Sequence, residues 1–142
     1  MNSQNPIWLI EDSKKDIELT LAALEDSNLA HRVIVLRDGS EVLERLRQLE
    51  IQGCDALPRA ILLDIKMPKV GGLEVLRSIK SHPRLKCLPV AMLTSSRQGS
   101  DIAECYALGA NAYVVKPVGF AEFFEAVEIL GKFWAVINER PE

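Results

Sequence analysis

The segment AILLDIKMPKVGG, residues 60–72, says most about how this chain folds. It begins with four apolar residues, Ala60–Leu63, which lead directly into a single carboxylate, Asp64. A short continuous apolar run is typical of a parallel strand that is buried on both faces. The Met67-Pro68 pair and Gly71-Gly72 then let the chain turn tightly toward the next segment. The segment therefore predicts a buried parallel strand that ends at Asp64 and is followed by a tight turn.

Four other short apolar runs predict four more strands: Ile7–Ile10, Val33–Leu36, Val90–Thr94 and Ala112–Val115. Helical spacing between the runs predicts helices at residues 13–26, 40–51, 72–81 and 100–108, and a fifth from about 119 to as far as 138. Strand and helix thus alternate five times, which is typical of an α/β fold with an open parallel sheet and helices on both faces. The 142 residues suit a single domain, with a core at about residues 7–137 and no output domain after it.

Composition narrows the function classes. A net charge of -3 argues against a general nucleic-acid binder, which normally carries a basic face. No apolar run approaches the roughly 20 residues of a membrane-spanning helix, and the first residues lack the features of a signal peptide. We expect a cytoplasmic protein without membrane contact, whose cysteines Cys54, Cys87 and Cys105 are reduced. His31 and His82 belong to no metal-ligand motif, and we expect both at the surface near element ends.

Polar residues follow the predicted strands at their carboxyl ends. They are Glu11 and Asp12 after the first, Asp64 after the third, Thr94 at the end of the fourth, and Lys116-Pro117 after the fifth. In a doubly wound sheet these strand ends form one edge, where ligands bind. Any one such residue is more often a turn former or a helix cap, as Ser13 and Asp16 are in a capping-box pattern. Their joint occurrence, in order, predicts one small cleft with three carboxylates, a hydroxyl and an ammonium.

The chemistry of this set indicates phosphoryl transfer. Clustered carboxylates repel one another unless a cation lies among them, and a site of oxygen ligands completed by water favours Mg²⁺. Asp64 could then attack phosphorus as a nucleophile. The metal and Lys116 would offset the charge of the phosphoryl oxygens, and Thr94 could donate a hydrogen bond to one of them.

As a set, these residues resemble the receiver domain of two-component response regulators. The matching motifs are Glu11-Asp12, Asp64 in LLDIKMPKVGG, Thr94 in MLTSS, and Tyr113 and Lys116-Pro117 in ANAYVVKP. The gaps between the last four positions also resemble the family pattern, and the resemblance covers roughly residues 7–137. It implies a flavodoxin-like, doubly wound sheet of five parallel strands in the order 2-1-3-4-5. It also implies a phosphoacceptor that catalyses its own phosphorylation and dephosphorylation, rather than a conventional enzyme.

The resemblance implies which residues bind phosphate and metal. Asp64 would accept a phosphoryl group from a phosphohistidine on a sensor histidine kinase. Asp12 and Asp64 would bind Mg²⁺ directly, Lys66 would bind it through its backbone carbonyl, and Glu11 would act through water. The family commonly has aspartate where this chain has Glu11. The longer side chain can still reach a water on the metal, so we expect activity to survive.

Lys116 and Thr94 would complete the catalytic set, and the resemblance implies a cis peptide between Lys116 and Pro117 that points the lysine into the cleft. Thr94 and Tyr113 would form a switch, in which the hydroxyl moves toward the phosphoryl group and the aromatic ring turns inward. Tyr113 could also be a plain core aromatic residue. Ser95 stands where a smaller alanine is usual in the family, which would alter access to the phosphoryl group.

The last predicted helix carries two apolar stripes. One consists of Phe123, Val127, Leu130 and Trp134, and the other of Ala126, Ile129, Phe133 and Ile137. A surface helix needs one stripe for its core, so the second belongs either to a deeply buried helix or to a face that contacts another molecule. We favour the contact and expect a homodimer through this helix, the fourth helix and the fifth strand. Ile129, Phe133 and Ile137 would lie in the interface.

Three further stretches resemble a narrower group: residues 52–59, the phrase VLRDGSEVLERL, and GKFW near the end. These are the stand-alone response regulators that pair with phytochrome-type light-sensing kinases in photosynthetic bacteria. The alternative is a degenerate receiver that regulates by contact alone, against which the complete set of Asp12, Asp64, Thr94 and Lys116 argues. A flavodoxin-like nucleotide binder is disfavoured, because it would need a phosphate-binding loop after the first strand, where the chain has EDSKKD without a glycine.

Overall fold

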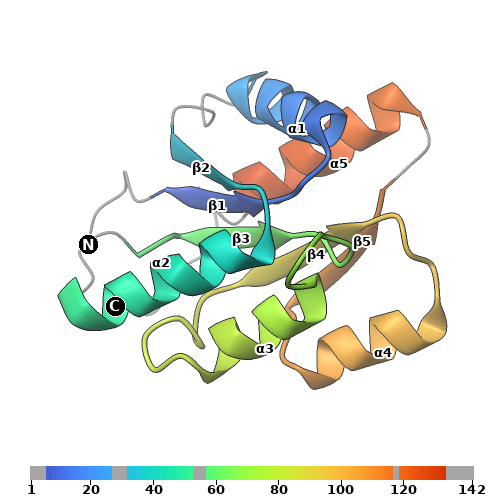
Figure 1. The fold of residues 1–142 in the computed structure, drawn as a ribbon. Coiled ribbons are helices and arrows are strands. Elements are labelled where there is room, and N and C mark those ends of the chain that lie inside the picture. The colour runs from blue at the N-terminus through green and yellow to red at the C-terminus, as the bar shows by residue number, and fades with distance from the viewer. Residues whose placement is uncertain (1–5, 27–31, 53–56, 117–118, 134–142) are drawn as a thin grey trace.

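The computed structural model describes residues 6–26, 32–52, 57–116 and 119–133. Within these ranges, strands and helices alternate five times, as predicted (Figure 1). They are β1 (Ile7–Ile10), α1 (Lys14–Asp26), β2 (Val33–Leu36), α2 (Gly39–Gln52), β3 (Ala60–Leu63), α3 (Gly72–Ser81), β4 (Val90–Thr94), α4 (Gly99–Ala107), β5 (Ala112–Val115) and α5 (Phe120–Lys132). All five strands have the predicted bounds, whereas residues 134–138 of the predicted last helix lie outside the described residues. Among the described helices, none is both long and apolar enough to cross a bilayer.

The strands form one parallel sheet in the order β2-β1-β3-β4-β5, which confirms the implied order. β1 therefore has β2 on one side and β3 on the other, and this is where the strand order reverses. Ligands of such sheets bind beside this point, at the carboxyl ends of the strands. The register pairs Ile10 with Leu63, and the Asp64 N–H donates to the Ile10 carbonyl at 3.0 Å. Glu11 and Asp64 thus leave the sheet side by side.

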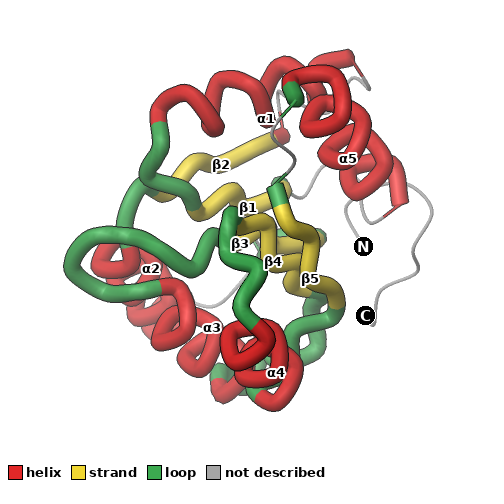
Figure 2. Tube along the Cα trace, turned by 90° about the vertical axis from the view of Figure 1, so that its right-hand side faces the viewer, coloured by secondary structure: helices red, strands yellow, loops and turns green. Residues whose placement is uncertain are grey.

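Helices cover both faces of the sheet. α1 and α5 pack together on one face, and α2, α3 and α4 cover the other (Figures 1 and 2). Successive side chains of a strand point to opposite faces, so each layer of helices has its own core. In β1, Trp8 and Ile10 pack toward α2, α3 and α4, whereas Ile7 and Leu9 pack toward α1 and α5. The inner strands β1, β3 and β4 are buried along their whole length, which explains why they are continuous apolar runs, whereas the edge strands β2 and β5 are largely half-buried.

Gly72, the first residue of α3, lies directly against the backbone that follows β3. A Cβ atom at this position would overlap the Asp64 carbonyl oxygen and would lie 2.6 Å from the Ile65 Cα. The Gly72 N–H donates to the Ile65 carbonyl at 2.7 Å. Because only glycine allows so close an approach, this residue fixes the start of α3 against the strand end that carries Asp64.

Gly72→Ala is expected to lower the free energy of unfolding by about 1–3 kcal/mol, the usual range for an overpacked site. Gly99→Ala is the matched control, because it also replaces the first residue of a helix. Among the described residues, a Cβ there would meet no atom within 4 Å. Urea unfolding followed by circular dichroism measures both variants. Equal stabilities would contradict the close approach at Gly72.

Candidate functional site

Three carboxylates from two strand ends meet at the carboxyl edge of the sheet. Glu11 and Asp12 follow β1, Asp64 follows β3, and one oxygen of each lies within 4.8 Å of the others. Glu11 and Asp64 are buried, whereas Asp12 is exposed. Mg²⁺ and Ca²⁺ take oxygen ligands at about 2.0–2.6 Å, so oxygens this close together can share one ion. The donor set therefore fits a hard divalent cation, with the exposed Asp12 on the side open to water and substrate.

The Lys116 ammonium lies among these carboxylates. It donates hydrogen bonds to Glu11 Oε1 and Asp16 Oδ2, each at 2.7 Å, and lies 3.8 Å from Asp64 Oδ2. Its side chain is only 11% exposed. Its backbone N–H donates to the Thr94 carbonyl at 2.7 Å, which holds the end of β5 beside β4. Lys116 thus lies in the predicted cleft, together with a carboxylate, Asp16, for which the sequence predicted only a capping role.

The crowding of charges shifts two pKa values. Burial raises the pKa of Glu11 to about 7, and repulsion by Asp64 adds to this, although Lys116 opposes both. Burial disfavours the charged form of Lys116, but its hydrogen bonds to Asp16 and Glu11 outweigh burial and leave its pKa raised. Lys116 is therefore charged at neutral pH and cannot by itself balance the surrounding carboxylates. This excess of negative charge is the physical reason why the cleft suits a cation.

Ser96 connects the two predicted switch residues. Thr94 is fully buried at the end of β4, and its Oγ1 accepts a hydrogen bond from the Ser96 N–H at 3.4 Å. Tyr113 packs partly buried against the core beside α2, α3 and α4, and its hydroxyl donates to the Ser96 carbonyl at 3.0 Å. The Ser96 hydroxyl donates to Asp101 in the first turn of α4. Ser96 thus links Thr94, Tyr113 and Asp101, a role that was not predicted from the sequence. The one feature of the sequence that points to it is the pair of serines directly after Thr94.

The remaining predicted site residues lie at the same edge of the sheet. Lys66 comes two residues after Asp64, in the loop before α3, and its side chain is exposed. Its role as a carbonyl ligand stays a prediction. Ser95 is exposed beside the buried Thr94. The predicted cis peptide involves Pro117, which lies outside the described residues.

A cavity of about 160 Å³ opens beside the ion pair of Asp16 and Lys116. It is lined by Lys15, Asp16, Leu19, Lys116, Gly119, Phe120 and Phe123, which come from α1, from the end of β5 and from the start of α5. Phe120 is 60% exposed there. The cavity therefore combines an apolar wall with the half-buried ion pair of Asp16 and Lys116.

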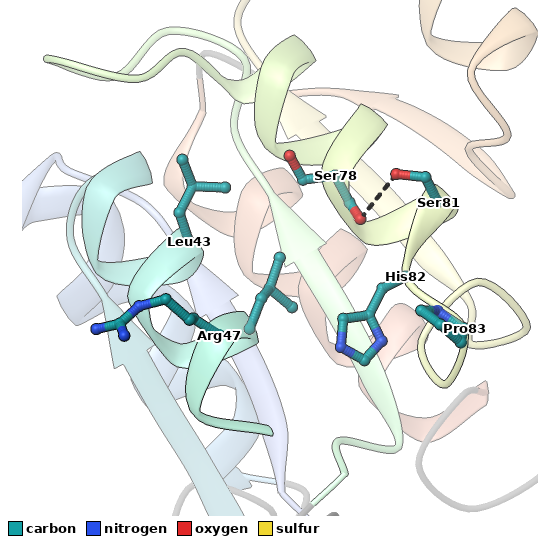
Figure 3. A pocket seen from close by; sticks show the side chains of 7 residues that line it. Leu43, Arg47, Ser78, Ser81, His82 and Pro83 are labelled. Atoms are coloured by element: carbon teal, nitrogen blue, oxygen red, sulfur yellow. Dashed lines mark hydrogen bonds between the residues drawn. The ribbon is translucent and has the colours of Figure 1, made fainter. Parts of the chain in front are cut away.

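A second cavity, of about 260 Å³, lies between α2 and α3, and none of the cleft residues lines it. Leu43 and Arg47 of α2, Ser78 and Ser81 of α3, and His82 just after α3 line it (Figure 3). His82 ends α3, but only 5% of it is exposed, so the expectation of a surface histidine is wrong. Its Nδ1 accepts a hydrogen bond from the Arg84 N–H at 3.1 Å, which ties the ring into the turn after the helix.

The two apolar stripes of α5 differ in burial. Phe123 and Val127 of the first stripe are buried in the core that α5 shares with α1. Ile129 and Phe133 of the second stripe are 59% and 45% exposed. The exposure of Ile129 and Phe133 therefore rules out the alternative that both stripes of the helix are buried within this chain. Ile137, the third predicted interface residue, lies outside the described residues.

Comparisons with known proteins agree with this architecture. The model of the response regulator receiver domain matches residues 7–128. The chain is 38% identical to the probable methanogenesis regulatory protein FilR2 of Methanothrix harundinacea, over 95% of this chain and 86% of that protein. It is also 38% identical to the response regulator Rcp1 of Synechocystis sp., over 94% of this chain and 90% of Rcp1.

Solved structures give the same picture. The phosphorylated cyanobacterial phytochrome response regulator RcpA has a TM-score of 0.88 at 38% identity, covering 97% of this chain and 99% of RcpA. The Mn²⁺-bound form of Rcp1 has a TM-score of 0.87 at 36% identity, with the same coverage. The bacteriophytochrome response regulator RtBRR has a TM-score of 0.72 at 52% identity, covering 96% of this chain and 84% of RtBRR. Fold, acidic cleft and family model agree, and the chain belongs to the response regulator receiver domain family.

Proposed function

We propose that this receiver accepts a phosphoryl group on Asp64 from a histidine kinase and signals through protein contacts that change with phosphorylation. The observation that carries the proposal is the buried Asp64 carboxylate, which lies among Glu11, Asp12 and the Lys116 ammonium. Membership of the receiver family implies a histidine kinase as partner. We place the protein in the cytoplasm, because a histidine kinase takes its phosphate from ATP there.

The proposed transfer is a displacement at phosphorus. An oxygen of Asp64 forms a bond to phosphorus while the bond from phosphorus to the histidine nitrogen breaks. The electron pair leaves with the imidazole nitrogen, which takes a proton from water. Lys116 offsets the charge of the phosphoryl oxygens, and the Thr94 hydroxyl donates a hydrogen bond to one of them. Hydrolysis of the acyl phosphate by water then releases inorganic phosphate and restores the Asp64 carboxylate.

We propose Mg²⁺ as the cation of the cleft. Asp12 and Asp64 would hold it directly, Lys66 through its backbone carbonyl, and Glu11 through water. Support comes from the close oxygens of the three carboxylates and from the relative Rcp1, whose structure contains Mn²⁺. When bound, the ion would neutralise charge on the phosphoryl oxygens.

The hydrogen bonds around Ser96 support a switch built from Thr94 and Tyr113. The Thr94 hydroxyl holds the Ser96 N–H, and Ser96 in turn holds the Tyr113 hydroxyl and Asp101 of α4. A phosphoryl group on Asp64 would draw the Thr94 hydroxyl toward itself, at the expense of its bond to Ser96. Phosphorylation would thereby change the surface formed by α4, β5 and α5.

We propose a phytochrome-type histidine kinase as the partner. RcpA is a phytochrome response regulator and RtBRR a bacteriophytochrome response regulator, at 38% and 52% identity to this chain. Radiolabelled phosphorylated kinase cores, one from a phytochrome-type kinase and one from a kinase without a phytochrome module, test the pairing. Transfer to this protein should be markedly faster from the first, and equal rates would contradict the pairing. Tight binding to the kinase with no transfer would instead favour a receiver that acts by contact alone.

We further propose a homodimer through the outer face of α5, together with α4 and β5. Support comes from three exposed apolar side chains on these helices: Ile129 and Phe133 on α5, and Tyr106, 50% exposed, on α4. Covering an apolar side chain of this size stabilises by about 1.5–3 kcal/mol. A few such residues from each of two chains can therefore hold a dimer.

Phe133→Glu is expected to convert this dimer into a monomer, because it would place an unpaired charge in an apolar contact. Light scattering at micromolar concentration measures the molar mass of both proteins. Ala121→Glu is the matched control, since it adds the same charge at an exposed position of α5 outside the stripe, and it should stay dimeric. A wild-type protein that is monomeric both with and without a phosphodonor would defeat the proposed interface.

A further inference from the structure

Asp16 reaches the cleft from α1, although the phosphoryl transfer to Asp64 described above does not use its carboxylate. Its Oδ2 accepts a 2.7 Å hydrogen bond from the Lys116 ammonium, which donates a second one to Glu11 at the same distance. The ammonium consequently lies 3.8 Å from Asp64 Oδ2. Hydrogen bonds between an ammonium and a carboxylate measure about 2.7–2.9 Å, so Lys116 makes none to the acceptor.

The fold holds Asp16 firmly enough for it to position another side chain. Asp16 lies in the first turn of α1, where its N–H donates to Ser13 Oγ at 3.3 Å. Its carbonyl accepts a 2.7 Å hydrogen bond from the Thr20 hydroxyl, and α1 packs against α5. A carboxylate in the first turn of a helix is also favoured by the helix dipole. One of the two hydrogen bonds of the Lys116 ammonium is thus anchored to a helix, whereas the other goes to Glu11 just after β1.

We propose that Asp16 is a positioning residue, which keeps the Lys116 ammonium off the attacking Asp64 carboxylate and within reach of the incoming phosphoryl group. This role rests on Asp64 being the phosphoacceptor. An ammonium has three N–H donors. Among the described residues, hydrogen bonds to Glu11 and Asp16 use two of them, which leaves the third for an oxygen on the Asp64 side. The 3.8 Å gap leaves room there for a phosphoryl oxygen, which a direct Lys116–Asp64 hydrogen bond would not.

Loss of the Asp16 charge has a predictable consequence. The ammonium would keep its hydrogen bond to Glu11, and attraction would draw it into direct contact with the Asp64 carboxylate. A carboxylate bonded to an ammonium is a weaker nucleophile, and the donor prearranged for the phosphoryl oxygen would be lost. Phosphorylation should therefore slow down. If only the net charge of the cleft mattered, Asp16→Asn would instead speed up phosphorylation, because removing a negative charge favours the approach of an anionic phosphodonor.

The test compares initial rates of phosphorylation by acetyl phosphate at saturating Mg²⁺. Asp16→Asn should react about tenfold more slowly than wild type, the lower end of the range for residues that act through another group. Glu18→Gln is the matched control, since it removes a charge from an exposed position of the same helix, and its rate should equal that of wild type. In a Lys116→Met background, Asp16→Asn should cause no further loss, because Asp16 acts through the ammonium.

A rate for Asp16→Asn equal to or above wild type would overturn the proposal, and so would a slowdown that persists in the Lys116→Met background. A crystal structure of metal-free Asp16→Asn tests the positioning without any phosphorylation. Lys116 Nζ should move from 3.8 Å to hydrogen-bonding distance of Asp64, and an unmoved ammonium would equally overturn the proposal. If the ammonium moves but wild-type protein takes up no phosphate, Asp64 as phosphoacceptor fails and the positioning by Asp16 stands.

Discussion

Asp64→Asn is expected to abolish phosphorylation of this protein by acetyl phosphate and Mg²⁺ while leaving it folded. Asparagine keeps the shape of the side chain but has no carboxylate to attack phosphorus, so labelling should fall to background. The strand end should keep its place, because the Asp64 N–H donates to the Ile10 carbonyl through the backbone. The substitution also removes the repulsion between Asp64 and the buried Glu11. Peptide mapping of an acid-stable, base-labile phosphate measures the loss, and thermal unfolding checks the fold.

Asp26→Asn is the matched control for this variant. It makes the same chemical change at an exposed position at the end of α1, and its labelling should match that of wild type. Phosphate that persists on another residue of Asp64→Asn would refute the assignment of the acceptor.

Asp12→Ala is expected to weaken Mg²⁺ binding and to slow phosphorylation together, each by at least about tenfold. One carboxylate of the three would be missing from the metal site, whereas Asp64 would remain as the nucleophile. Because Asp12 is exposed, its truncation leaves no buried hole and the fold should persist. Calorimetric titration measures Mg²⁺ binding, and initial labelling rates are measured over a range of Mg²⁺ concentrations.

A high Mg²⁺ concentration should restore part of the rate of Asp12→Ala but none of the rate of Asp64→Asn. This difference separates a residue that only binds the metal from the one that attacks phosphorus. Asp26→Ala, at the far end of α1, should bind Mg²⁺ like wild type. A full wild-type phosphorylation rate in excess chelator would show that the metal has no part in the reaction.

The fold could be predicted because burial of the strands, its main determinant, is visible in the sequence as short apolar runs. Strands covered on both faces must be apolar throughout, and the runs of β1, β3 and β4, which are buried along their whole length, stand out for that reason. The close approach of Gly72 to Asp64 could not be predicted from a glycine pair alone, because it depends on where α3 begins relative to β3. The burial of His82 was missed for a similar reason, since it is set by the packing of α2 against α3.

The cleft was predictable only in part. Glu11, Asp12, Asp64 and Lys116 stand directly after strands, so their meeting follows from the sheet alone. Asp16 stands in the first turn of a helix, where an aspartate is common for local reasons, and its pairing with Lys116 needs the packing of α1 beside α5. The common local role of an aspartate at a helix start thus gave no reason to expect its contact with Lys116, which lies 100 positions away in the sequence.

The hydrogen bonds at Ser96 couple the surface at β5 to the surface at α4. Through its N–H, its carbonyl and its hydroxyl, this one residue holds Thr94, Tyr113 and Asp101. A displacement of Ser96 cannot alter the β5 side without also altering the first turn of α4. Two partner proteins that bind these neighbouring surfaces would therefore respond to the same conformational change. If phosphorylation displaces Ser96, as proposed above, the surfaces at β5 and at the start of α4 would change together, as one signal.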